Sequence, residues 1–315
     1  MPKFFHELAD AKGLFEALAG EMNVSTAIAE KDYWVMHCLW GLTQGGFRFE
    51  LKGGTSLWRG WNIIDRFSED IAIRFEPPKT LNVRDEKKPG NVKARFAFFD
   101  ELAARISVPG IEVERNRSHD HRKATNAGIS LNYVSHFPPD PALKSEVLLE
   151  LGFHQTAPNE DRDFTSWALQ KALAVGLDII DNRAKAVKCF NPEYTFVDKL
   201  QTICRYYRQY RDGKDGEKPL LPRKFLRHYY DFYMLLGVDR VVRFIGSKEY
   251  EEYKALKLRG EDAREFASRE AFALSHPKTF ALFKDEFKSM GRLLLSPGPS
   301  FEDVIGRIRE CSPRI

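Results

Sequence analysis

The chain has little cysteine and no long apolar run. Four cysteines stand far apart among its 315 residues and form no CxxC pair: Cys38, Cys189, Cys204 and Cys311. This spacing argues against a zinc site or a disulfide framework and favours the reducing cytoplasm as the place of action. A membrane helix needs about 20 consecutive apolar residues. No such run is present in the sequence, so we expect no membrane partner.

The excess of positive charge is small, with 49 Lys and Arg against 45 Asp and Glu. It permits a polyanionic partner without requiring one. The basic residues are clustered, however, in a stretch from Arg205 to His228 that also holds Lys214 and Lys218 and is interleaved with tyrosines. Such a surface can hold phosphates and stack bases. The candidate RNA-binding residues are therefore Arg205, Arg208, Arg211, Arg223, Lys224 and Arg227. An ordinary solvated helix face with core tyrosines is the alternative.

Periodicity divides the chain into a mixed half and a helical half. Helical spacing covers residues 5–18, 23–42 (with Ser25 as N-cap), 55–61 and 92–106, and residues 76–90 are typical of a loop. Strand-like alternation covers residues 47–51, 71–75, 111–114, 128–134 and 146–152. From about residue 163 the pattern is helical, apart from a possible strand at 186–189. We therefore expect an α+β fold, with residues 1–160 forming a small mixed sheet with N-terminal helices and residues 161–315 a mainly helical lobe.

The first informative motif is a glycine turn, Lys52-Gly53-Gly54-Thr55-Ser56, between an expected strand and a short helix. Glycines let backbone amides approach a phosphate closely, and a helix N-terminus favours negative charge. Thr55 and Ser56 add hydroxyl donors, and Lys52 adds a positive charge. Taken alone the pair of glycines indicates only a turn, because turns use this dipeptide constantly.

The second motif is an incomplete pair of carboxylates. Residues i and i+2 of a strand point to the same side, so an Asp-x-Asp pair would direct two carboxylates at one place. Two Mg²⁺ ions that hold a triphosphate require such a pair. Here Asp70 is present, but residue 72 is alanine. Without further context this stretch would be only a turn before an apolar strand.

Five segments in order resemble the AbiEii/AbiGii nucleotidyltransferase toxins, which have the polymerase-β-like nucleotidyltransferase fold and act in type IV toxin–antitoxin systems. The segments are Glu30-Lys31-Asp32-Tyr33-Trp34-Val35, Lys52-Gly53-Gly54-Thr55-Ser56-Leu57, Arg66-Phe67-Ser68-Glu69-Asp70-Ile71, Pro192-Glu193-Tyr194-Thr195-Phe196-Val197-Asp198-Lys199-Leu200 and Arg227-His228-Tyr229-Tyr230-Asp231-Phe232-Tyr233. The resemblance runs from Glu30 to about Leu236. The chain departs from the family pattern at Ala72, where relatives carry the second aspartate.

The resemblance implies roles for the matching residues. Asp70 would bind Mg²⁺ or Mn²⁺, together with an aspartate in the place of Ala72. Lys199 would contact the triphosphate, where an ammonium offsets developing charge. Asp231 would orient Lys199 or the acceptor hydroxyl. The nucleotide would also be held by Lys52, Gly53, Gly54, Thr55 and Ser56, beside Ser68, which matches a serine that some relatives modify when they are silenced.

Glu150 is the candidate for a third carboxylate, which in such folds lies on a neighbouring strand and serves as a base or metal ligand. Glu146 would share its strand face and is the competitor. A solvent-facing glutamate with no role is the alternative for both.

The implied function is a toxin, of a toxin–antitoxin or phage-defence system, that transfers NMP from an NTP to an acceptor and releases pyrophosphate. The expected acceptor is the 3′ end of tRNA, and the expected partner is a cognate antitoxin protein. A protein acceptor, modified by AMPylation, is an alternative. So is a kinase-like transfer of the γ-phosphate. We expect a monomer.

Ala72 has two explanations. The chain is either a degenerate relative that binds NTP or RNA without turnover, or a chain in which an aspartate was replaced by alanine so that a toxic enzyme could be produced. The intact remainder of the motif favours the second. Alanine is harmless in a strand beside Ile71 and Ile73, so we expect the fold to survive and catalysis to be lost.

Overall fold

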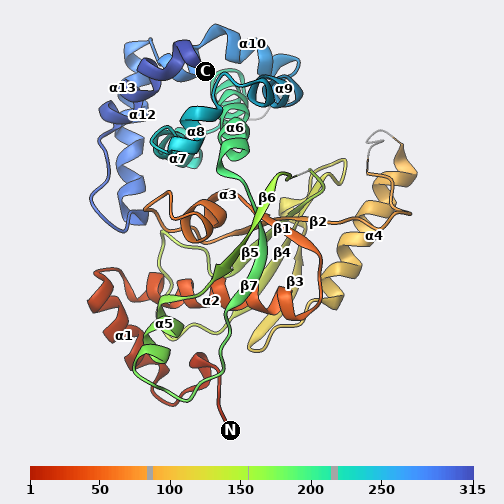
Figure 1. Ribbon diagram of the computed structural model, residues 1–315, viewed down its shortest axis with the longest axis vertical. Helices are drawn as coiled ribbons and strands as arrows, with labels where there is room; N and C mark the ends of the chain where they lie inside the picture. Colours follow the sequence, from red (N-terminus) through yellow and green to blue (C-terminus); the bar gives the residue numbers. More distant parts are fainter. Residues whose placement is uncertain (84–87, 155, 214–218) are drawn as a thin grey trace. The chain divides into compact units, whose positions relative to one another are not determined.

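The computed structural model describes residues 1–83, 88–154, 156–213 and 219–315. The chain forms two compact units (Figure 1). The first, here called the sheet unit, contains Met1–Gly60 and Phe67–Phe190. The second, the helical unit, contains Trp61–Arg66 and Asn191–Ile315.

A mixed β-sheet organises the sheet unit. Within the described residues its seven strands follow the order β3-β4-β5-β2-β1-β7-β6. Their bounds are β1 Phe49–Lys52, β2 Ile71–Phe75, β3 Ile111–Asn116, β4 Asn126–Tyr133, β5 Val147–Gly152, β6 Asn159–Phe164 and β7 Ala184–Phe190. Alternating burial in β2 places Ile71, Ile73 and Phe75 in the core, as expected for a strand with one covered face.

The registers at the centre of the sheet bring three predicted residues side by side. β1 pairs with β2 antiparallel, and Lys52 lies opposite Ala72. β2 pairs with β5 parallel, and Ala72 lies beside Glu150. Neighbours paired in this way point their side chains to the same face of the sheet. Lys52, residue 72 and Glu150 therefore form one row across three strands.

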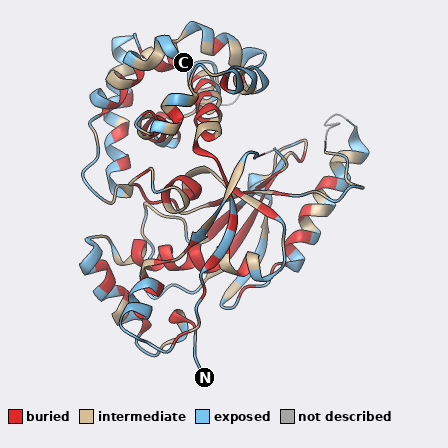
Figure 2. Cartoon of the chain, in the orientation of Figure 1, coloured by how far each residue is buried: buried red, intermediate tan, exposed pale blue. Residues whose placement is uncertain are grey.

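The helices of the sheet unit include one that is buried over most of its length. α2 (Thr26–Gln44) packs against β5 and β7, and every residue from Ile28 to Leu39 is buried (Figure 2). Its start is fixed by Ser25, whose hydroxyl accepts a hydrogen bond from the Ile28 amide, as a good N-cap does. The remaining short and long helices are η1 Phe5–Glu7, α1 Ala11–Met22, α3 Gly53–Thr55, η2 Ser56–Gly60, α4 Pro89–Arg105, η3 Arg117–His119 and α5 Trp167–Ala174.

Helices alone make up the regular structure described in the helical unit. They are α6 Pro192–Asp212, η4 Pro222–Lys224, α7 Arg227–Leu235, α8 Asp239–Phe244, α9 Lys248–Lys257, α10 Glu261–Ser268, α11 Glu270–Ala273, α12 Pro277–Phe287, η5 Lys288–Leu293, α13 Phe301–Cys311 and η6 Ser312–Arg314. The segment 61–66 joins this unit through backbone contacts. Arg66 bridges to Leu294, and the Leu295 amide donates to the Asp65 carbonyl.

The α+β fold is confirmed, and the structure corrects three predicted details. The two units divide at Phe190, not at residue 160, because β7 pairs with β1 and so belongs to the sheet. β6 was missed because its sequence, Asn-Glu-Asp-Arg-Asp-Phe, is a charged edge strand without apolar alternation, a pattern that protects sheet edges. The first helix is interrupted at Leu8–Asp10, so α1 starts at Ala11. The predicted loop 76–90 includes residues 84–87, which lie outside the described residues.

Candidate active site

The glycine turn packs against residue 72. Gly53 directly follows β1 and has a φ of +77°, a conformation that favours glycine. A Cβ built on Gly53 would lie 3.4 Å from the Ala72 Cβ. The two predicted motifs therefore meet within the sheet unit, at the row formed by Lys52, residue 72 and Glu150.

The hydroxyls of this turn make internal contacts. Thr55 Oγ1 donates to the main-chain carbonyl of Asp70 and lies 3.1 Å from Ser68 Oγ. Ser56 Oγ lies 3.0 Å from Cys189 Sγ. Thr55 and Ser56 are fully buried, and Ser68 is nearly so. In this structure the hydroxyls hold the turn against the start of β2, whereas Lys52, Gly53 and Gly54 of the predicted phosphate site are partly exposed.

Asp70 is held by a lysine that the sequence did not single out. Both carboxylate oxygens of Asp70 accept hydrogen bonds of 2.7 Å from Lys144 Nζ. The backbone of Lys144 is fixed as well, because its amide donates to Glu69 and its carbonyl accepts from Lys31 Nζ, at 2.7 and 2.6 Å. The side chains of this pair are not sealed off, with 14% of Asp70 and 31% of Lys144 exposed.

Burial shifts the two supporting charges. It raises the pKa of Glu69 and lowers the pKa of Lys31, each opposed by the neighbouring opposite charge. Lys31 is completely buried, and its ammonium also donates to the Glu146 carbonyl at 2.5 Å. Hydrogen bonds offset the cost of burying these two charges. Lys31 donates to the carbonyls of Lys144 and Glu146, and Glu69 accepts from the Lys144 amide.

Register favours Glu150 over Glu146 as a companion of residue 72. Glu150 is the direct neighbour of Ala72 and is exposed. Glu146 precedes β5, and its carboxylate accepts from the hydroxyl of Ser145 at 3.0 Å.

The donors at this position do not fit a divalent metal ion in this chain. Ala72 offers no oxygen, and the Asp70 carboxylate is occupied by an ammonium. Among the described residues, no group of three or more His, Cys, Asp or Glu side chains is arranged to hold a metal. Mg²⁺ needs oxygen ligands in near-octahedral geometry, and the single engaged carboxylate does not provide them.

Lys199 and Asp231 form a buried ion cluster in the helical unit. Lys199 on α6 donates to Asp231 on α7 at 2.5 Å. Arg66 clamps the same carboxylate with two hydrogen bonds, of 2.6 and 2.8 Å. His228, one turn before Asp231, lies 3.2 Å from Lys199 Nζ. Lys199 and Asp231 are thus core residues, whereas charges on a helix usually face solvent.

The cations of the cluster control its protonation. Although burial opposes it, Arg66 and Lys199 hold the pKa of Asp231 well below its usual range. Burial lowers the pKa of Lys199 despite the attraction of Asp231. Burial, together with the charges of Lys199 and Arg227, lowers the pKa of His228 well below 6.5. His228 is therefore neutral at pH 7, and its Nδ1 can accept a hydrogen bond from the Lys199 ammonium.

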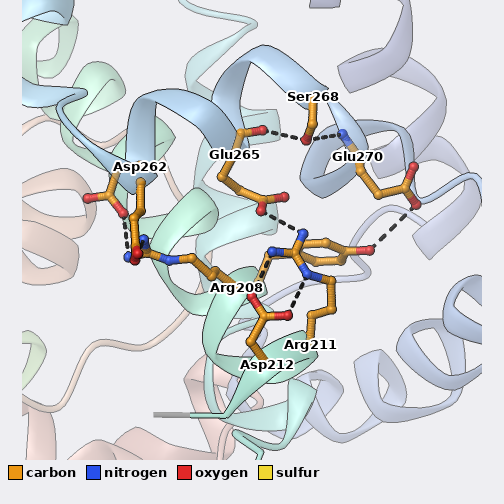
Figure 3. Close-up of polar contacts among 9 residues, drawn as sticks. Arg208, Arg211, Asp212, Asp262, Glu265, Ser268 and Glu270 are labelled. Atoms are coloured by element: carbon orange, nitrogen blue, oxygen red, sulfur yellow. Dashed lines mark hydrogen bonds and ion pairs between the residues drawn. The ribbon is translucent and has the colours of Figure 1, made fainter. Parts of the chain in front are cut away.

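The basic stretch divides into paired and exposed residues. Arg208 and Arg211 of α6 bind the acidic side chains of α10, at 2.8 Å from Asp262 and 2.8 Å from Glu265 (Figure 3). Arg205, Arg223, Lys224 and Arg227 are exposed, and so is Arg211 in spite of its ion pairs. Lys214 and Lys218 lie outside the described residues.

The tyrosines of the same stretch are largely core residues. Tyr207, Tyr229 and Tyr230 are buried, so the alternative interpretation holds for them. Tyr206 is partly exposed, and the guanidinium of Arg205 lies 5.1 Å from the centre of its ring. Of the predicted aromatic surface, Tyr206 and Tyr210 remain partly exposed.

The sequence did not reveal the hydrogen bonds that the charged residues at the start of α2 make. Glu30 accepts hydrogen bonds from the Ser135 hydroxyl and the His136 amide, while Asp32 accepts from the Trp167 amide and from Arg59. With Lys31 they anchor four separate segments to one buried helix: residues 135–136, residues 144–146, Arg59 and Trp167. The Glu30-Lys31-Asp32 run was the available signal, since adjacent charges inside an apolar helix require partners.

Arg66 was also missed as a site residue, although it belongs to a matching segment. Nothing local in the sequence indicates that Arg66 pairs with a residue 165 positions away.

Comparison with known protein families identifies the family of the chain. A family described as nucleotidyl transferase AbiEii toxin, type IV TA system, matches residues 41–307, which is most of the chain. The match includes the region after about residue 240, where the sequence motifs gave no resemblance, and it starts after Glu30–Val35. A comparison with curated proteins found no match. None of the helices in the described part of the chain has the length and apolar character to cross a membrane. Family match, mixed sheet and order of motifs together place this chain in the AbiEii family of nucleotidyl transferase toxins of type IV toxin–antitoxin systems.

Proposed function

We propose that the natural reaction of this chain transfers NMP from an NTP to the 3′ end of tRNA, and that Ala72 makes the chain inactive. The acceptor hydroxyl attacks the α-phosphorus, a new P–O bond forms, and the α–β anhydride breaks to release pyrophosphate. Membership of the family implies a nucleotide substrate and an antitoxin partner. The finer identities of acceptor and antitoxin are part of the proposal, as are a monomeric state, action in the cytoplasm and a role in phage defence.

One observation carries the proposal: residue 72 lies where the glycine turn, Lys52 and Glu150 meet, two positions after Asp70. A carboxylate at 72 would share a strand face with Asp70, as a metal-bound triphosphate requires. An alanine there leaves the fold intact and removes that ligand.

Residues of the helical unit are proposed to act in the same reaction. The Lys199 ammonium would offset charge on the triphosphate, and Asp231 would orient it, with Arg66 fixing Asp231. Neutral His228 would take part in positioning Lys199. The exposed residues Arg205, Arg223, Lys224 and Arg227 would contact RNA phosphates, whereas Arg208 and Arg211 are engaged by α10.

The test is the Ala72→Asp variant, made by cell-free synthesis because an active toxin stops growth. It is incubated with Mg²⁺, total RNA and each α-labelled NTP. We expect labelled tRNA at a rate on the order of 10²-fold or more above the chain with Ala72, because a lost ligand misplaces the reacting groups. The matched control is Ala72→Asp combined with Asp70→Asn, which should be inactive. No transfer by a folded Ala72→Asp variant would contradict the proposal.

The same reactions separate the alternatives. Label transferred from γ-labelled but not α-labelled NTP would indicate a kinase-like phosphotransferase. Label in protein but not in RNA would indicate AMPylation.

A non-catalytic binding module is the second candidate, favoured by Ala72 itself and by the Lys144 contact to Asp70. This candidate predicts that the chain with Ala72 binds NTP or RNA tightly and that Ala72→Asp adds no turnover.

A further inference from the structure

Two ion pairs lie at the start of β2 in the sheet unit. Asp70 and Glu69 carry negative charge, and Lys144 and Lys31 carry positive charge. Lys144 binds both oxygens of Asp70, and Lys31 Nζ lies 3.8 Å from Glu69 Oε2. In the chain with Ala72, each of these two carboxylates therefore has an ammonium partner. An aspartate at 72 would add a further negative charge beside Asp70.

The side chains of Lys31 and Lys144 differ in how firmly they are held. Lys31 is completely buried and tied to two carbonyls, so it is a fixed support. Lys144 is fixed only through its backbone, while its side chain is 31% exposed. A lysine ammonium on a four-carbon stem can leave a partner without backbone movement. The Lys144 ammonium is thus a replaceable cation on a rigid base.

We infer that Lys144 is the resident cation of this site and competes with a divalent metal ion for the Asp70 carboxylate. The inference deepens the proposed function and rests on it for the role of Asp70. In the chain with Ala72 the ammonium keeps the site closed to metal. An aspartate at 72 would supply a second carboxylate beside Asp70, and oxygen ligands of this kind favour a divalent ion over the ammonium.

The competition is measured with Mn²⁺ alone, from the electron paramagnetic resonance signal of the free ion, with no nucleotide present. Four proteins are compared: the chain with Ala72, Ala72→Asp, Lys144→Met, and Ala72→Asp with Lys144→Met. We expect weak binding with Ala72, tighter binding in Ala72→Asp, and a further tightening of roughly three- to tenfold in the double variant, the size expected for loss of a partly exposed ion pair.

Two controls guard the interpretation. Lys171→Met removes a lysine that pairs with Glu21 on an exposed face of the same unit, and it should leave Mn²⁺ affinity unchanged. Lys144→Arg retains the charge, so in the Ala72→Asp background it should keep the weaker affinity. If Lys144→Met fails to fold, as judged by circular dichroism, the Lys144→Ala variant replaces it in both backgrounds.

Unchanged or weaker Mn²⁺ binding after removal of the Lys144 ammonium from the Ala72→Asp variant would overturn the inference. This result is distinguishable from failure of the proposed function. If Mn²⁺ binding tightens as expected but no label is transferred, the function fails and the competition stands. If label is transferred but Lys144→Met leaves Mn²⁺ affinity unchanged, the function stands and the competition fails.

Discussion

Asp70 in the sheet unit and Asp231 in the helical unit are both motif aspartates paired with a lysine, yet their surroundings differ. The Asp231 side chain is completely buried and that of Lys199 is 8% exposed. Asp70 and Lys144 keep 14% and 31% of their side chains exposed. A second cation, Arg66, completes the buried cluster, whereas Lys144 holds both oxygens of Asp70.

The difference separates a fixed charge from an exchangeable one. Breaking a buried pair leaves an uncompensated charge in a medium of low dielectric, which is costly. Breaking a partly exposed pair returns both groups to water at little cost. The Asp231 cluster is therefore part of the core that folds the helical unit, and the Asp70 pair is the one that a ligand can open.

The largest expected effect comes from breaking the buried cluster. Asp231→Asn should lower the free energy of unfolding by about 3–5 kcal/mol, because Arg66 and Lys199 would lose their counter-charge. Urea denaturation followed by circular dichroism measures it. Asp285→Asn, which removes an exposed carboxylate from the same unit, is the control and should leave stability unchanged. A loss for Asp231→Asn no larger than that of the control would show that the cluster does not stabilise the fold.

The second-largest loss of stability is expected from a change at Lys31, the buried lysine that holds the backbone of Lys144. Lys31→Met leaves the carbonyls of Lys144 and Glu146 without their donor, at a cost of roughly 1–3 kcal/mol. Hydrogen exchange should become faster around residues 144–146, and Lys171→Met should not change it. Unaltered protection in Lys31→Met would mean that other contacts fix this loop.

A pH titration should distinguish the buried cluster further. The pKa of His228 is lowered in the folded chain, so the unfolded chain binds more protons below about pH 6.5. The contribution of neutral His228 to the free energy of unfolding is therefore fully present above that pH. It falls as the pH is lowered below about 6.5. His228→Gln should flatten part of this fall in unfolding experiments between pH 7.5 and 5. The remaining slope belongs to groups such as His37, whose pKa burial lowers to about 4. If the free energy of unfolding depends on pH in the same way in the variant, His228 does not contribute to this dependence.

The smallest effect is expected at Asp70. Asp70→Asn should change the free energy of unfolding by no more than about 1 kcal/mol, and less at high ionic strength, because the pair is partly exposed and screened by salt. The same denaturation experiment at low and high salt measures it. A loss as large as that of Asp231→Asn would erase the distinction between the two aspartates.

Local patterns predicted most of the elements. The alternation at Ile71–Phe75 and the N-cap at Ser25 are set by neighbouring residues, and both were found where expected. The charged edge strand β6 was not predicted, because its solvent-facing residues carry no apolar signal. The boundary between the units was misplaced for a related reason: the pairing of β7 with β1 joins residues far apart in the chain.

The sequence by itself determined the order of the motifs, the family and the missing carboxylate at residue 72, because these depend only on which residues stand at which positions. Only the tertiary structure decided which cation meets which aspartate. Lys144 lies 74 positions from Asp70, and Arg66 lies 165 positions from Asp231. Such pairs depend on how strands and helices pack, and neither spacing nor composition encodes that packing locally.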